Sequence, residues 1–81
     1  MEASIARNIV MHRSTELEHL RKADANIAAA LERIKRQTSL VAQLMESGQD
    51  TATATSVLQT MRNTLAAMQQ HRRIIEKEIE G

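Results

Sequence analysis

Apolar side chains recur at intervals of three and four residues along two long stretches of this chain, and one polar segment separates the stretches. This spacing places them along one side of an α-helix. The first stretch holds Leu17, Leu20, Ile27, Leu31, Ile34, Val41 and Met45, and the second holds Leu58, Met61, Leu65, Met68, Ile75 and Ile79. The pattern predicts an all-α fold, an antiparallel two-helix hairpin resembling a coiled coil, in which each stripe covers the other.

The polar segment, residues 47–51, carries the signals of a helix end followed by a helix start. Gly48 is the single glycine inside the chain, which has no proline. A glycine at this point can adopt the left-handed conformation that ends a helix, and Asp50 or Thr51 can cap the next one. We therefore expect a hairpin over residues 15–81, with a helix to about residue 47, a turn at 47–51 and a helix over 52–79.

The start of the first helix has two interpretations. Thr15 and Glu18 form a capping box, which would start a helix at Thr15 and leave a separate short helix before it. The absence of glycine or proline near Ser14 instead favours one rod from about residue 3. In both cases residues 1–14 form a helical extension that the second helix does not reach. Counting outward from the turn places Ile34 opposite Leu65.

Several apolar residues fall outside the predicted contact between the two helices. Ala23, Ala30 and Leu44 flank the stripe of the first helix, and Val57 and Ile74 lie beside that of the second. Apolar faces wider than one coiled-coil contact indicate more than one neighbour. We expect a homodimer in which two hairpins form a four-helix bundle, or a hairpin that binds a helical partner. The predicted interaction surface comprises Ile5, Ile9, Val10, Leu44, Val57 and Ile74.

Two charged residues, Asp24 and Arg72, occupy positions in the stripes where apolar residues are expected. Across the hairpin they fall about one helical turn apart, so they can form a partly buried salt bridge. Such a pair tends to fix register and partner choice more than it adds stability. The alternative is that both side chains reach solvent at the edge of the contact.

Composition narrows the class of protein. The chain has 81 residues, 11 basic and 10 acidic side chains, and no cysteine or aromatic residue. It is therefore one small domain without disulfides. Its near-neutral charge and lack of aromatic stacking groups argue against nucleic-acid binding, and a solvated face is the preferred account of Arg33, Lys35 and Arg36. No apolar run suits a membrane span or signal peptide, so we expect a cytoplasmic protein without a membrane partner.

The histidines suggest no chemistry that the rest of the sequence supports. His12, Glu16 and His19 share a helix face at metal-ligand spacing, but a solvated polar face explains them equally well. None of the histidines has a nucleophile or an orienting acid suggested by the sequence. We expect no catalytic residue, no metal and no cofactor, and hence no enzyme.

Two resemblances bear on function. Glu18-His19-Leu20-Arg21 resembles the phosphoacceptor box of the dimerisation domains of sensor histidine kinases, but the usual proline is missing. Asn63-Thr64-Leu65-Ala66 resembles a segment that follows the phosphoacceptor in one alphaproteobacterial kinase class, and there the histidine position falls on Gln59. That resemblance implies a phosphotransfer or dimerisation hairpin of two-component signalling, and no ATP-binding domain accompanies it.

The second resemblance covers about residues 24–79. It rests on the Arg36-Gln37 pair, on the turn Gly48-Gln49-Asp50-Thr51 and on positions of the two stripes. The further positions are Ile34, Lys35, Val41, Leu44, Ala54, Leu58, Met61, Leu65, Met68, His71, Arg72 and Ile75. On these the chain is similar to small uncharacterised alphaproteobacterial helical-hairpin proteins, which implies a bacterial cytoplasmic hairpin and carries no known activity.

Together these features predict a protein-protein interaction module, a small regulatory or adaptor protein that acts through an apolar helical stripe. A secretion-chaperone-like subunit is an alternative of the same broad class, since small helical hairpins of this size stabilise export substrates. The phosphotransfer hairpin is the alternative from a different class.

Overall fold

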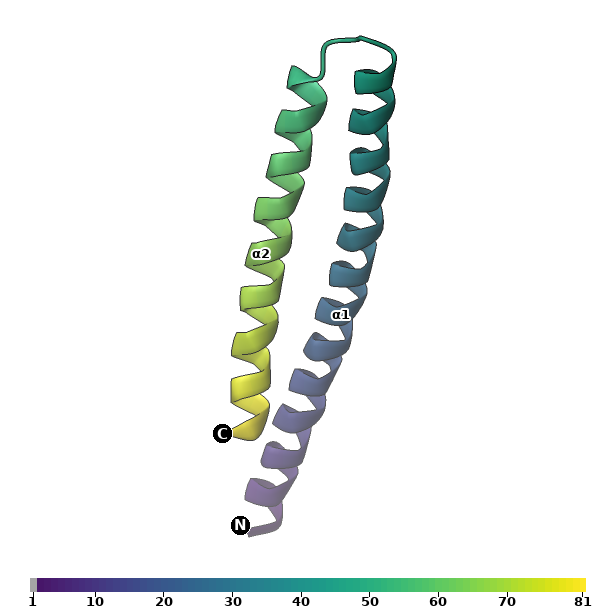
Figure 1. The fold of residues 1–81 in the computed structure, drawn as a ribbon. Coiled ribbons are helices and arrows are strands. Elements are labelled where there is room, and N and C mark those ends of the chain that lie inside the picture. Colours follow the sequence, from purple (N-terminus) through teal and green to yellow (C-terminus); the bar gives the residue numbers. More distant parts are fainter. Residues whose placement is uncertain (1) are drawn as a thin grey trace.

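The protein is a hairpin of two long helices that lie side by side and run in opposite directions (Figure 1). The computed structural model describes residues 2–81, with side chains described for residues 14–81. Helix α1 spans Glu2–Glu46 and helix α2 spans Ala52–Glu80. The hairpin measures 70 × 15 × 14 Å, and within residues 2–81 it is one layer of two helices with no third element over either side. The predicted all-helical hairpin is confirmed.

Helix α1 is one continuous rod across Ser14 and Thr15, so the capping box does not start a helix there. Glu18 instead accepts a hydrogen bond from Arg21 Nη2, at 2.6 Å, and this bond lowers the pKa of the Glu18 carboxyl. Because α1 has 45 residues and α2 has 29, α1 extends about four turns beyond the end of α2, as Figure 1 shows. The predicted interaction residues Ile5, Ile9 and Val10 fall in this extension, and their side chains lie outside the described ones.

The turn ends α1 with a Schellman motif, in which two amides return to carbonyls of the last helical turn. Gly48 N donates to Met45 O at 3.1 Å, and Gln49 N donates to Leu44 O at 2.9 Å. Gly48 has a φ of 70°, the left-handed conformation expected for it. Asp50 Oδ1 then accepts a hydrogen bond from Ala52 N at 3.0 Å, whereas the Thr51 side chain makes no cap hydrogen bond. Asp50 therefore satisfies one of the free amides at the start of α2.

Replacing Gly48 by alanine is expected to lower the free energy of unfolding by about 1 kcal/mol, because a β-carbon disfavours the left-handed conformation. Steric crowding adds nothing, since a Cβ at this position would meet no atom within 4 Å. Urea denaturation followed by circular dichroism measures the change. Gly48→Asn should lose less, because asparagine tolerates this conformation. Equal stability of Gly48→Ala and the unmodified chain would contradict the role of Gly48 in the turn.

The two helices meet along a seam of buried and half-buried side chains that alternate in steps of three and four. On α1 the seam residues are Glu16, Leu20, Ala23, Ile27, Ala30, Ile34, Gln37, Val41 and Leu44. On the α2 side they are Thr51, Ala54, Leu58, Met61, Leu65, Met68, Arg72, Ile75 and Ile79. Ile75 is the least exposed of them, at 3%. This strict alternation is the heptad pattern of an antiparallel coiled coil.

The register of the hairpin differs from the sequence-based count by about one helical turn. Pairing the seam residues outward from the turn sets Ile34 opposite Met61 instead of Leu65. In this pairing Gln37 lies opposite Leu58, and its Nε2 donates to Ala54 O, one turn closer to the hairpin end, at 2.9 Å. The reason is the tight end of α1: the chain reverses at Gly48, not at the middle of residues 47–51, so α2 begins closer to the end of α1.

The face of α1 that contacts α2 is also shifted around the helix from the apolar face predicted from the sequence. Leu17, Leu31 and Met45 were expected in the contact, yet they are 51%, 50% and 67% exposed. Ala23 and Ala30, expected beside the stripe, are 7% and 8% exposed. Alanine therefore occupies the contact at these two positions, and Leu31, one position after Ala30, turns out of it.

Candidate interaction surface

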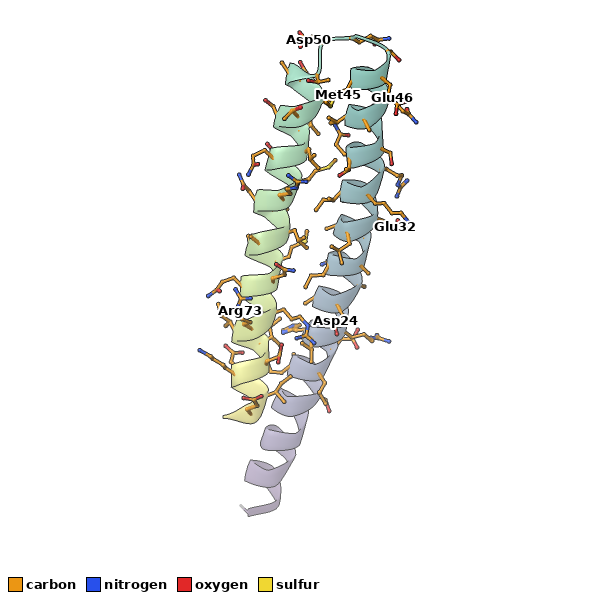
Figure 2. The ribbon with its side chains drawn as sticks, in the orientation of Figure 1. Asp24, Glu32, Met45, Glu46, Asp50 and Arg73 are labelled. Atoms are coloured by element: carbon orange, nitrogen blue, oxygen red, sulfur yellow. The ribbon has the colours of Figure 1, made fainter. Side chains whose placement is uncertain are left out.

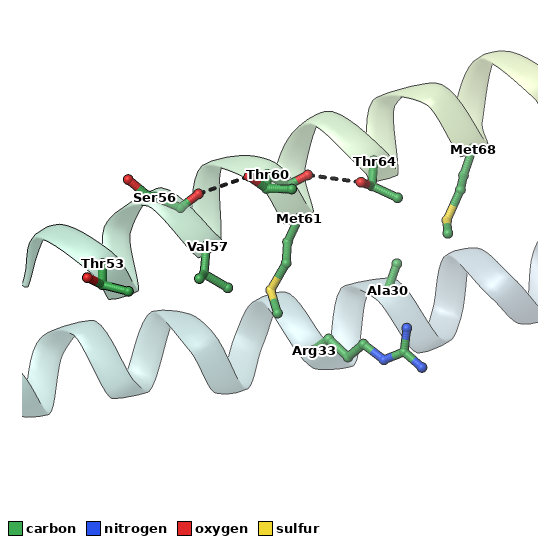
Figure 3. A pocket seen from close by; sticks show the side chains of 9 residues that line it. All are labelled: Ala30, Arg33, Thr53, Ser56, Val57, Thr60, Met61, Thr64 and Met68. Atoms are coloured by element: carbon green, nitrogen blue, oxygen red, sulfur yellow. Dashed lines mark hydrogen bonds between the residues drawn. The ribbon is translucent and has the colours of Figure 1, made fainter.

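A groove runs along one side of the hairpin, between α2 and the middle of α1, with a volume of about 420 Å³ (Figure 3). Most of its lining comes from α2, and α1 contributes Ala30 and Arg33. The α2 residues are Thr53, Ser56, Val57, Thr60, Met61, Thr64 and Met68. The groove exists because Ala30 is small: it leaves space beside the long side chains of Met61 and Met68, which reach toward α1.

The hydroxyl groups in the groove are engaged by their own helix. Thr60 Oγ1 donates to Ser56 O at 3.1 Å, and Thr64 Oγ1 donates to Thr60 O at 3.0 Å (Figure 3). A threonine that bonds back to the preceding turn in this way uses its donor within the helix. The methyl groups of Thr60 and Thr64 are then free to contact a neighbour, so the surface of the groove is more apolar than the residue types that line it suggest.

Among the predicted interaction residues with described side chains, the structure separates Leu44 from the other two. Leu44 is half-buried within the seam, close to the turn, so the hairpin itself partly covers it. Val57 lines the groove and is 40% exposed, and Ile74 is 47% exposed on the same helix. Val57 and Ile74 are therefore available to another molecule in a way that Leu44 is not.

A second set of exposed apolar residues lies on α1, and sequence reasoning placed it in the contact between the helices. We call Leu17, Leu31 and Met45 the α1 row; they recur every fourteen residues, two heptads apart. Asp24 and Thr38 occupy the intervening heptad positions of this row. The row could have been predicted from the sequence by a strict heptad assignment that accepts the polar residues Glu16 and Gln37 in the contact. In that assignment each member of the row follows a seam residue by one position.

The predicted pair Asp24 and Arg72 is brought together by the structure. Arg72 lies in the seam of α2 and its Nε donates to Asp24 Oδ1 at 2.5 Å, while its Nη1 donates to Glu76 Oε1. The hydrogen bond with Asp24 raises the pKa of the Arg72 guanidinium above its ordinary value. Asp24 lies beside the seam, on the side of α1 toward α2, whereas Glu32 and Glu46 lie on the far side (Figure 2). The pair spans the two helices at the edge of their contact.

Among the side chains of residues 14–81, the remaining polar groups form no cluster of potential metal ligands. His19 Nδ1 lies 3.6 Å from Glu16 Oε1, and His12 falls outside the described side chains. No group of three or more potential metal ligands occurs among the described residues. Lys35 and Arg36 border a shallow hollow on α1 together with Glu32, so this patch of α1 is of mixed charge. Over the described part of the chain, neither helix has a segment long and apolar enough to cross a bilayer.

Comparison of the chain with protein-family models, with curated proteins and with solved structures found no match. The groove and the exposed apolar side chains are therefore the features of this hairpin that bear on its function.

Proposed function

We propose that this protein is a non-catalytic interaction module of the cytoplasm, a small regulatory or adaptor protein that self-associates through an apolar helical face into a four-helix bundle. The observation that carries the proposal is the set of large apolar side chains left outside the seam. Their exposed fractions run from 40% for Val57 to 67% for Met45. They lie on both helices, as Leu17, Leu31, Leu40 and Met45 on α1 and Val57 and Ile74 on α2. Exposed apolar side chains that recur along a helix typically mark a surface that binds another protein.

The surface area of the hairpin supports the same conclusion. A compact monomer of 9.1 kDa would expose about 4,900 Å². The chain exposes 6393 Å², which is about 1,500 Å² more. If each of two copies covered this excess on the other, the interface would bury about 3,000 Å² in total, which is within the range of stable homodimers. A two-layer assembly would also give each helix the second neighbour that bundle helices have.

Sedimentation equilibrium over a wide concentration range tests the proposal. We expect a mass of about 18 kDa, twice the 9.1 kDa of the chain, and a helical circular dichroism signal that falls as the dimer dissociates on dilution. Detection uses interference optics or absorbance of the peptide bond, because the chain has no aromatic residue. A fully helical monomer at every concentration would contradict self-association.

A further inference from the structure

We infer that two copies of this chain pair through a single face of α2, with the two α2 helices antiparallel and related by a two-fold axis. The face is the α2 stripe, which we define as Val57, Thr60, Thr64, Ala67, His71 and Ile74. The inference rests on the proposed self-association and adds which surface carries it and in which orientation. It predicts that Val57 packs against Ile74 of the second copy.

The spacing of the α2 stripe is the first observation. Its members follow one another in steps of three, four, three, four and three, a series that reads the same in both directions. A two-fold axis reverses the direction of one helix relative to the other, so a stripe meets its own copy in register only when its spacing is symmetric. The midpoint of this stripe falls between Leu65 and Ala66, and the axis would pass there.

The identity of the residues follows the same symmetry at the ends and at the centre of the stripe, and Thr60 meets His71 between them. Val57 and Ile74 lie at the two ends, equally far from the midpoint, and are 40% and 47% exposed. Thr64 and Ala67 are the two small central residues, which let two helix backbones approach closely. Reversal therefore brings each large apolar end onto the other end, and small residue onto small residue. All six side chains are exposed in the single hairpin and are free to be covered.

The electrostatics of α2 favour this face. Between Val57 and Ile74 the charged residues are Arg62, Arg72 and Arg73, and none of them is part of the stripe. The Thr60 and Thr64 hydroxyls donate within the helix, which removes two donors that burial would otherwise leave unsatisfied. Two copies can therefore bring this face together without burying a permanent charge.

The α1 row is less suited to the same role. Asp24 interrupts it between Leu17 and Leu31, and this carboxylate is held in place by Arg72. Covering the row with its own copy would remove a paired charge from water, which is costly. The groove that Val57, Thr60 and Thr64 of the α2 stripe help to line, in contrast, is open to a second helix. Met61 and Met68, which also line it, are flexible enough to pack around that helix.

Disulfide cross-linking tests the orientation, because the chain has no cysteine and each introduced thiol is the single one present. Equal amounts of the full-length variants Val57→Cys and Ile74→Cys are mixed and treated with a mild oxidant. We expect the mixed disulfide between the two variants to form at least tenfold faster than the disulfide of either variant with itself. Mass spectrometry distinguishes the three products.

Leu31→Cys and Met45→Cys serve as matched controls on the α1 row, since both residues are at least half exposed. They should form no rapid disulfide. Rapid formation of a disulfide between two copies of Val57→Cys, or between two copies of either control, would overturn the α2 arrangement. If sedimentation still gave the mass of a dimer, the proposed function would stand. A monomer in sedimentation would overturn both.

A pair of neighbouring alanines gives a second test that needs no cross-link. Ala67 lies on the α2 stripe, and Ala66, also exposed, lies about 100° around the helix from it. Ala67→Asp places two carboxylates near the axis, so the dissociation constant of the dimer should rise at least tenfold. Ala66→Asp should leave it unchanged, with the same helical content in both variants. Equal dissociation constants for the two variants would overturn the inference.

Discussion

Replacing Leu58 by alanine is expected to lower the free energy of unfolding by about 2–3 kcal/mol, and Leu31→Ala by less than about 1 kcal/mol. The chemical change is the same in both variants, and so is the gain in helix propensity. The difference lies in burial: Leu58 is 7% exposed in the seam, and Leu31 is 50% exposed in the α1 row. Truncating Leu58 removes contacts with α1 and leaves a void, whereas Leu31 is half in water already.

Urea denaturation followed by circular dichroism measures both values, at one protein concentration because self-association adds to the apparent stability. The loss for Leu58→Ala is a large part of the total, since a chain of this length has a stability of about 4–12 kcal/mol. Equal losses for the two variants would mean that Leu31 is covered as well as Leu58, and would place the α1 row in an interface.

Substitution of Ala30 by aspartate is expected to cost about 3 kcal/mol or more and to unfold a large fraction of the hairpin at room temperature. Ala30 is 8% exposed in the seam. A carboxylate at this position would lose most of its contact with water, and the half-buried seam residues Leu65 and Met68 of α2 offer it no hydrogen bond. The melting temperature and the helical signal at low temperature measure the effect.

Ala28→Asp is the matched control, because Ala28 lies in the same run of three alanines and is exposed. The two variants share the same loss of helix propensity, so they differ in burial alone. Ala28→Asp should remain within about 0.5 kcal/mol of that shared loss. If Ala30→Asp proved no less stable than Ala28→Asp, the rotation of α1 that buries Ala30 in place of Leu31 would be contradicted.

These two experiments address the part of the structure on which the proposed function depends. The α1 row is exposed because Ala30 and the other seam residues of α1, not Leu31, face α2. If Leu58→Ala and Ala30→Asp destabilise the protein while Leu31→Ala and Ala28→Asp are tolerated, the residues that pack between the two helices of one chain are established. The faces left over are those that another molecule can bind.

The sequence by itself determined the elements of this protein and the place of its turn. The two periodic stretches, the absence of proline and the position of Gly48 predict two helices and a reversal within a few residues, and α1 and α2 have those bounds. These features are local: they depend on backbone preference and on spacing within one helix. The possible pairing of Asp24 with Arg72 could be foreseen from the approximate register, and their side chains do meet.

Only the tertiary structure decided which side of α1 faces α2. Leu20, Ile27, Ile34 and Val41 lie in the contact, as their spacing predicts. The positions beside them were ambiguous: hydrophobicity favours Leu17, Leu31 and Met45, whereas the structure places Ala23, Ala30 and Leu44 in the contact. The tight turn at Gly48 sets the register in which this second set packs against α2. Side-chain volume and the geometry of the turn act between the helices, so the spacing within either helix could not reveal which apolar residues remain exposed.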